Sequence, residues 1–425
     1  MTAAILFGSF FILLLLNIPI ALSLGVSSII TLLAEGLPLS MVPSNLYSST
    51  GKFVLLAIPF FILGGNIMDK SGISERLINF CRSLVGHRRN GMAMVCVIVA
   101  CFFAAISGSG PATVAALGAI LIPAMTNSGY DKSRSTALMA TAGGIGIIIP
   151  PSITFVIYGS ITGQSVGALF ASGMFPGILM GAILIITMCV ASRNRELVVL
   201  PKASTKERLV SFKDAFAGIL MPVIILGGIY GGVFTPTEAA AVSSIYGLFV
   251  GFFIYRTLKL SDLMQLLKDS VSQTAVVMFI VGTASLFAWV LTVTGIAADA
   301  SNALIQVCGD NKYIFLVIIN VILLIAGCFI DANSAFYILV PILYPVGVQL
   351  GVDPVHLGTI MVMNMAIGLV TPPVGVNLYV GCGIAKISLK QISIAVIPFV
   401  LASIAALLLV TYIPAISMFL PRLFG

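Results

Sequence analysis

Charged residues are scarce in this sequence of 425 residues. They make up 8% of the chain, whereas about 25% is usual in soluble domains. Because 59% of the residues are hydrophobic, such a chain cannot cover its surface with side chains that water accepts. The seven cysteines are scattered without a C-x-x-C pair, so a disulfide or zinc framework has no support. These properties predict an all-α polytopic membrane protein.

Several catalytic motifs are also missing from the sequence. It has no G-x-x-x-x-G-K-[ST] phosphate loop, so we do not expect the chain itself to hydrolyse ATP. It has neither HExxH nor GxSxG, and no histidine accompanies the acidic residue Asp331 inside its apolar stretch. The sequence therefore predicts no enzymatic activity.

Apolar stretches alternate with short basic segments along the whole chain. Those of the length that crosses a membrane, about 20 residues, lie near 3–33, 53–69, 136–160, 168–190, 215–233, 238–255, 271–293, 357–381 and 392–413. We expect the first of these to be a single membrane span, and the segment 256–269, where Leu and Met alternate with charges, to be a short helix lying on the membrane surface.

Two longer apolar stretches, 91–126 and 313–349, are interrupted in the middle by polar residues. The interruptions are Ser107–Pro111 and Asp331–Ser334. Each remaining arm has about 15 residues, or roughly 23 Å of helix at 1.5 Å per residue, which is shorter than a hydrocarbon core of about 30 Å. We therefore expect two re-entrant helical hairpins, each entering and leaving the membrane on one side.

The chain repeats itself at an offset of 222 residues. In this register Pro123 pairs with Pro345, Asp131 with Asp353, and the double proline at 150–151 with that at 372–373. The two hairpins and the two broken helices, 136–160 and 357–381, fall in the same register. We therefore divide the chain into a first repeat, 1–205, and a second repeat, 206–425.

The basic residues predict that the two repeats are inverted in the membrane. The loop 70–90 contains five Lys and Arg residues, whereas its counterpart, 294–312, contains only Lys312. Under the positive-inside rule the first hairpin opens to the cytoplasm and the second to the opposite side. When the whole chain is traced across the membrane with the hairpins in these orientations, 18 of its 21 basic residues fall on the cytoplasmic side. Inverted repeats are typical of secondary transporters.

The interrupted helices offer four places where a transporter could bind ions and substrate near the membrane midplane. Two are the hairpin tips, where Pro111 is expected to open one half-helix and Asp331 to precede another. The other two are the glycine and proline runs within the broken helices, here called the first break (141–154) and the second break (364–377), where freed carbonyls and hydroxyls suit Na⁺. Each feature also has a purely structural interpretation. Asp331 could serve as a helix cap and nothing more, and serine and threonine hydroxyls often form hydrogen bonds to the backbone of their own helix.

These residues together resemble the large membrane subunit of a tripartite ATP-independent periplasmic (TRAP) transporter. The resemblance rests on the Ser-Gly-Ser-Gly-Pro-Ala-Thr tip, the Gly-Gly-Ile-Gly run followed by Ile-Pro-Pro-Ser, and the Thr-Pro-Pro-Val-Gly-Val-Asn run, and it covers nearly the whole chain. It implies an elevator mechanism, a Na⁺ gradient with two or more Na⁺ ions, and a bacterial inner-membrane location. It also implies two partners, a small four-helix membrane subunit on a separate chain and a periplasmic substrate-binding protein.

The resemblance places one Na⁺ between the first tip and the first break, and another between the second tip and the second break. The expected Na⁺ ligands are Ser107, Ser109, Gly143, Gly144, Gly146, Asp331, Asn333, Asn364, Gly368 and Thr371. The expected substrate contacts are Ser107, Gly110, Ser152, Thr154, Asp331, Ser334 and Asn377.

The family implies an organic acid as substrate, and the polar tips favour sialic acid (N-acetylneuraminate) over a C4-dicarboxylate. Two alternatives remain at this point. One is a Na⁺-coupled dicarboxylate symporter that works without a binding protein, because that family shares paired hairpins and proline breaks. The other is a passive anion channel, although the sequence contains no continuous polar pore lining.

Overall fold

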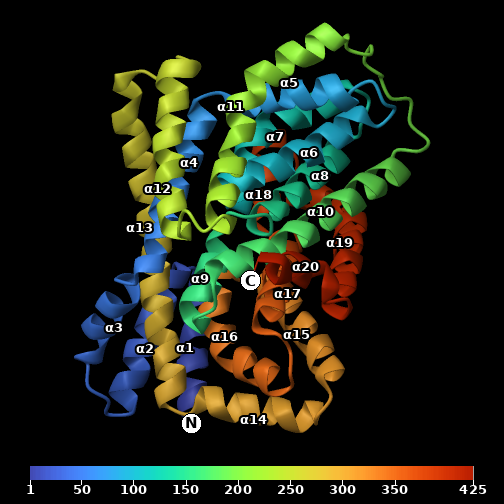
Figure 1. Ribbon diagram of the computed structural model, residues 1–425. Helices are drawn as coiled ribbons and strands as arrows, with labels where there is room; N and C mark the ends of the chain where they lie inside the picture. Colours follow the sequence, from blue (N-terminus) through green and yellow to red (C-terminus); the bar gives the residue numbers. More distant parts are fainter. Residues whose placement is uncertain (425) are drawn as a thin grey trace.

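The computed structural model describes residues 1–424 and folds them into helices joined by short loops (Figure 1). The helices of the first repeat are α1 (Thr2–Leu15), α2 (Ile20–Ala34), α3 (Met41–Thr50), α4 (Ala57–Lys70), α5 (Ile73–Val85), α6 (Gly91–Ser107), α7 (Gly110–Asn127), α8 (Lys132–Gly144), α9 (Ile153–Thr162) and α10 (Val166–Ala191). Those of the second are α11 (Thr205–Tyr230), α12 (Pro236–Phe249), α13 (Leu260–Val293), α14 (Ile296–Cys308), α15 (Lys312–Gly327), α16 (Ala332–Gln349), α17 (Pro354–Gly368), α18 (Val376–Ala385), α19 (Leu389–Tyr412) and α20 (Ala415–Phe424).

Within residues 1–424, eight helical segments are long and apolar enough to cross a membrane, which confirms a multi-pass membrane protein. The two hairpins are also present, as α6 with α7 and α15 with α16. Helices α7 and α16 begin and end at positions 222 residues apart, so the repeat in the sequence is also a repeat of structural elements.

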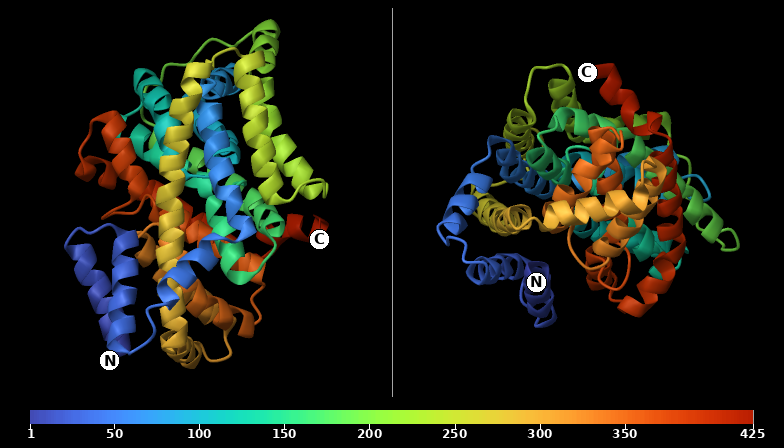
Figure 2. Two further views of the ribbon diagram at one scale, coloured as in Figure 1. Left: turned by 90° about the vertical axis from the view of Figure 1, so that its left-hand side faces the viewer. Right: turned by 90° about the horizontal axis from the view of Figure 1, so that it is seen from below.

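Two sequence-based expectations were wrong. The stretch 3–33 is not one span but two short helices side by side, α1 and α2, because Asn17 has a φ of 61° and Pro19 cannot continue a helix (Figure 2). The segment 256–269 is not a separate surface helix, since from Leu260 onward it is the first part of the 34-residue helix α13.

Helices α5 and α14 lie across opposite ends of the molecule (Figure 1). They occupy equivalent positions in the two repeats, and each is preceded by a glycine with positive φ, Gly72 and Gly295. Helix α5 carries Arg76 and Arg82, whereas α14 contains no Lys or Arg. The two ends of the molecule thus differ in charge as the inverted orientation requires.

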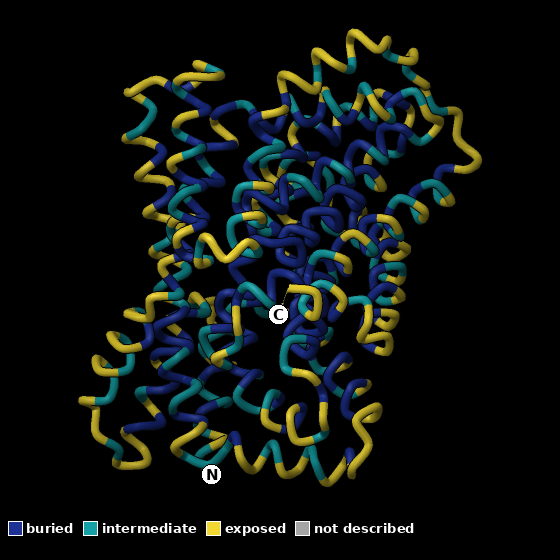
Figure 3. The backbone as a smooth tube through the Cα atoms, in the orientation of Figure 1, coloured by how far each residue is buried: buried dark blue, intermediate teal, exposed yellow. Residues whose placement is uncertain are grey.

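The helices form two units. Helices α1–α4 and α11–α13 contact one another and form an upright frame, with α4, α12 and α13 standing side by side (Figures 1 and 2). Helices α6–α10 and α15–α20, which include both hairpins and both broken helices, pack together as a second group, here called the hairpin unit. The most deeply buried backbone lies in the hairpin unit, where α8 and α17 end (Figure 3).

Candidate functional site

The first hairpin tip is a sharp turn that exposes the start of α7. Helix α6 ends at Ser107, Gly108 adopts a left-handed φ of 60°, and Ser109 is extended before α7 begins at Gly110. A side chain at Gly108 would also meet the carbonyl oxygen of Pro151 at 2.8 Å. Pro111 lies in the first turn, as predicted, where its missing N–H costs nothing. Glycine and proline thus stand at the positions of the tip where the backbone conformation favours them.

The polar atoms of this first tip gather on one side. The Ser107 and Thr113 hydroxyls lie 2.9 Å apart, and the Thr113 hydroxyl donates to the carbonyl of Ser109 over 2.8 Å. Thr113 is fully buried and was missed as a candidate in the sequence, although it lies one helical turn after Ser109. The tip thus presents neutral oxygens, which are the ligands that unwound segments offer to Na⁺.

The first break packs backbone to backbone against this tip. A Cβ atom added at Gly146 would lie 2.8 Å from the Thr113 hydroxyl and 2.9 Å from the Ser109 carbonyl oxygen. A Cβ at Gly143 would meet Val114 and would lie 3.2 Å from the carbonyl oxygen of Gly110. The structure therefore brings the first tip together with Gly143 and Gly146, two of the three glycines that the resemblance pairs with it. Gly144 instead faces the second repeat, because its Cβ would lie 2.9 Å from the carbonyl oxygen of Ala366.

Asn377, from the second break, also reaches the first tip. It is fully buried, donates to the carbonyl of Ala140 over 2.9 Å, and has its amide atoms 3.3 Å from where a Cβ of Gly110 would be. Its side-chain oxygen has no hydrogen-bond donor. A buried oxygen without a donor is costly, and a bound cation would satisfy it. Asn377 thus fits the set of neutral oxygens around a Na⁺ ion.

The second tip repeats this arrangement with an acidic residue. The carboxylate of Asp331 accepts hydrogen bonds from the backbone N–H groups of Asn333 (3.0 Å) and Ser334 (3.2 Å) and from the Ser334 hydroxyl (2.5 Å). Asp331 is therefore the N-cap of α16, as its residue type indicates. A carboxylate has about four lone-pair sites, so these three donors leave room for a further partner. Asn333 is half-buried beside it.

The second break contacts this tip at two places. A Cβ atom at Gly368 would lie 2.5 Å from the Cα atom of Gly327, at the end of α15. The N–H of Val374 donates to the carbonyl of Cys328 over 3.2 Å. The hydroxyl of Thr371 bonds to the carbonyl of Ile367 at 2.7 Å, its own preceding turn.

Asn364 lies in a different setting from the one that the pairing of Asp331 with 364–371 suggests. Its amide donates to Asn320 in the middle of α15 over 2.8 Å, and Asn320 in turn reaches Thr411 of α19. The side-chain oxygen of Asn364 is buried without a donor. Which neighbours Asn364 contacts depends on the face of α17 on which it lies, and the sequence alone does not show that face.

A cavity of about 710 Å³ separates the first tip from the frame. Ser107, Ser109 and Pro111 line one wall, and Asn66 of α4 and Gln273 of α13 line the other. Neither Ser152 nor Thr154 lines it. Ser152 instead caps α9 and donates to the carbonyl of Ile147 over 2.6 Å, and Thr154 is 2% exposed.

The residues that the frame contributes to the cavity lining were not predicted from the sequence. Asn66 donates to Ser270 over 2.9 Å and so joins α4 to α13. Asn66 is a single amide within an apolar run, which was a signal in the sequence, whereas Gln273 lies among the polar residues Ser272 and Thr274 and does not stand out.

The electrostatics of this cavity are unusual for an anion site. No lysine or arginine is among the residues that line it. An adjoining hollow of about 340 Å³, which shares Asn66, Asp69 and Gln273 with it, leads outward to Lys70 at the end of the molecule that carries α5. Inside the cavity, the positive end of the α7 dipole is the available attraction for an anion.

Comparisons with known proteins agree with this geometry. A family model described as the DctM component of the tripartite ATP-independent periplasmic transporter matches residues 7–416. Proteins named C4-dicarboxylate TRAP transporter large permease protein DctM are 40% identical in Rhodobacter capsulatus, over 100% of both chains, and 44% identical in Pseudomonas aeruginosa, over 95% of this chain and 94% of that one. The sialic acid TRAP transporter large permease protein SiaM of Vibrio cholerae is 37% identical over 97% of this chain and 96% of its own.

Among solved structures, the YdaH transporter of Alcanivorax borkumensis has a similar fold. It gives a TM-score of 0.61 at 14% sequence identity, over 87% of this chain and 86% of that one. At that identity the likeness supports the membrane-transporter fold.

Proposed function

The chain belongs to the DctM family of large permease subunits of tripartite ATP-independent periplasmic transporters, and we propose that it imports an organic acid together with Na⁺. Its relatives are permease subunits, not enzymes, in keeping with the missing catalytic motifs. The expected partners are a small four-helix membrane subunit and a periplasmic binding protein that delivers the substrate.

The observation that supports coupling to Na⁺ is the lack of basic side chains around the cavity at the first tip. An anion entering it would meet the dipole at the start of α7, uncharged side chains and the acidic residue Asp69, which gives no attraction. A Na⁺ ion held by the Ser107 and Thr113 hydroxyls, the Ser109 carbonyl and Asn377 would add a full positive charge beside that cavity. Anion binding would then depend on Na⁺ binding, because the ion supplies the missing charge.

For the substrate, a C4-dicarboxylate is the first candidate. The relatives of 40% and 44% identity carry that name, whereas the relative named for sialic acid is 37% identical. The preference for sialic acid taken from the polar tips stays a prediction, and it is the second candidate because the Asp331–Ser334 tip offers acceptors for substrate hydroxyls.

For the mechanism, we propose an elevator movement of the hairpin unit against the frame. The cavity at the first tip lies between these two units, and the adjoining hollow leads toward the end of the molecule that carries α5. Under the positive-inside rule that end is cytoplasmic. The structure then corresponds to an inward-facing state. To reach the outward-facing state, the hairpin unit would have to shift toward the end of the molecule that carries α14.

Uptake of radiolabelled succinate into vesicles tests the proposal. We expect saturable uptake when the chain is reconstituted with its small subunit, supplied with its binding protein and given an inward Na⁺ gradient. Parallel measurements with N-acetylneuraminate decide between the two substrates. Uptake of either acid by the chain alone without the binding protein would favour the stand-alone symporter, and uptake without saturation or Na⁺ dependence would favour the channel.

A further inference from the structure

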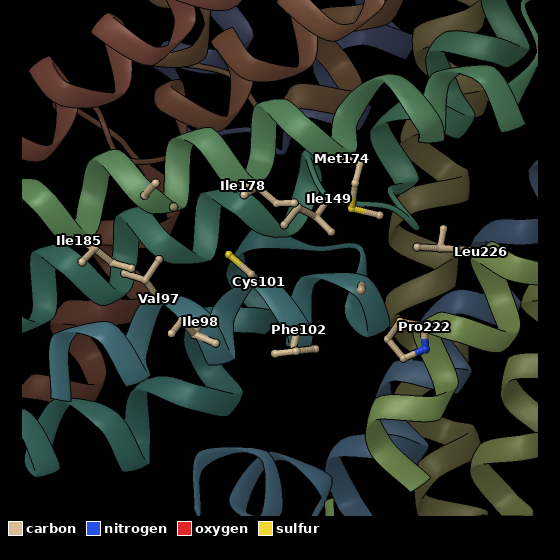
Figure 4. Close-up of a pocket in the computed structure, with 13 residues that line it drawn as sticks. Val97, Ile98, Cys101, Phe102, Ile149, Met174, Ile178, Ile185, Pro222 and Leu226 are labelled. Carbon is tan, nitrogen blue, oxygen red and sulfur yellow. The ribbon is translucent and has the colours of Figure 1, made fainter. Parts of the chain in front are cut away.

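A second cavity, of about 400 Å³, lies on another side of the hairpin unit and has a different chemistry (Figure 4). It is enclosed by α6 and α10 of the hairpin unit, by Ile149 of the first break, and by α11 of the frame. All 13 residues that line it are apolar, and the side chains drawn in Figure 4 are of carbon and sulfur, apart from the ring nitrogen of Pro222.

The lining residues form helical stripes that face a shared space. On α6, Ile98, Cys101 and Phe102 follow the spacing of one helix face, and all three are half-buried. On α10, Met174 and Ile178 are one turn apart, as are Pro222 and Leu226 on α11. Side chains this apolar usually pack against other side chains. Here they surround a space that the protein leaves unfilled.

We propose that this crevice, formed by the facing stripes of α6, α10 and α11, binds an acyl chain of a membrane phospholipid. A void of this size would forfeit the contacts of all its lining atoms. Water is a poor occupant, because no lining side chain offers it a hydrogen bond of ordinary strength. The occupant must therefore be apolar.

The crevice is also open to the lipid around the protein. Ile178, which lines it, is 50% exposed, and the same two helices expose further apolar side chains, Ile186 of α10 at 61% and Val223 of α11 at 59%. Helices α10 and α11 both have the length and hydropathy of membrane spans. A lipid chain can thus enter from the bilayer without crossing a polar surface.

The position of the crevice gives the lipid a mechanical role. It lies between α6 and α10, which belong to the hairpin unit, and α11, which belongs to the frame and touches α6 elsewhere. An acyl chain between them would fill the gap without fixing the two units to each other by side-chain interdigitation. Occupancy by lipid stands independently of the proposed transport function.

Tryptophan fluorescence with brominated lipid tests the proposal, because the chain has a single tryptophan, Trp289. In a Trp289→Phe background, the variants Phe102→Trp, Val223→Trp and Phe170→Trp place the probe in the crevice, on the outer surface and in the fully buried core, respectively. Each is reconstituted with the small subunit in vesicles of dioleoylphosphatidylcholine, or of the same lipid brominated along its chains, since bromine quenches tryptophan on contact.

We expect bromination to reduce the fluorescence of Phe102→Trp to an extent comparable with Val223→Trp and to leave Phe170→Trp unchanged. If bromination leaves the fluorescence of Phe102→Trp unchanged, as in the core control, the proposal is overturned. In that case a helix of the small subunit or a rearranged side chain fills the crevice in place of lipid. Ile98→Trp, half-buried on the same stripe, serves as a second probe if Phe102→Trp does not fold.

Discussion

Replacing Asp331 with asparagine is expected to raise the Na⁺ concentration needed for uptake strongly while the protein still inserts and folds. Asparagine caps helices about as well as aspartate, so the bonds to the N–H groups of Asn333 and Ser334 can persist. The lost feature is the negative charge. Hydrogen bonds to charged groups are worth about 1.5–3 kcal/mol, and the loss of a Na⁺ contact of that strength would weaken Na⁺ affinity roughly 10- to 100-fold.

A matched control exists in the same repeat. Asp353 caps α17 in the same way, accepting from the N–H groups of Val355 (2.8 Å) and His356 (3.0 Å), but it is exposed in the loop before α17. Asp353→Asn should leave the Na⁺ dependence of uptake unchanged. If Asp331→Asn keeps wild-type uptake over a full Na⁺ titration, Asp331 is only a cap and its assignment as an ion contact fails.

Replacing Gly146 with alanine is expected to weaken Na⁺ affinity by a comparable factor, through steric strain instead of a lost charge. The new methyl group would lie 2.8 Å from the Thr113 hydroxyl and 2.9 Å from the Ser109 carbonyl oxygen, so the first tip and the first break must separate. Overpacking of a tight contact costs about 1–3 kcal/mol. If this strain falls on the oxygens that hold Na⁺, Na⁺ affinity should fall roughly 5- to 150-fold.

The control for this substitution is Gly383→Ala in α18. A Cβ at Gly383 meets nothing within 4 Å, and the position is exposed and helical. Alanine there should preserve both folding and uptake. The measurement is the Na⁺ concentration at half-maximal uptake, with protein amount and monodispersity checked for each variant. An unchanged value for Gly146→Ala would mean that the tip and the break do not form the ion site.

The hairpins and breaks were predictable because each is a polar or proline interruption in an otherwise apolar run. Such interruptions are visible in the sequence whatever the tertiary structure. The N-terminal pair α1 and α2 was missed because its interruption, Asn17 to Pro19, is only three residues long and followed by another apolar run. The start of α13 was assigned to the membrane surface because its charges obscured a helix that continues without a break into the next span.

The site was harder to predict than the fold, because it depends on which face of a helix meets which neighbour. Asn377 was chosen as a substrate contact, but its position against Gly110 and Ala140, in the other repeat, follows from tertiary packing alone. Asn66 and Gln273 belong to the frame, whose helices carry no tips or breaks to attract attention. Residues on a cavity wall can be assigned only when both walls are known.

The inverted arrangement of the two repeats is the central claim of this account, and cysteine accessibility tests it most directly. Asn127 and Gln349 are the last residues of α7 and α16, lie 222 positions apart and are both exposed. In a background without the seven native cysteines, Asn127→Cys should react with a membrane-impermeant maleimide from the cytoplasmic side and Gln349→Cys from the opposite side. Reaction of both cysteines from the same side would contradict the inverted repeat.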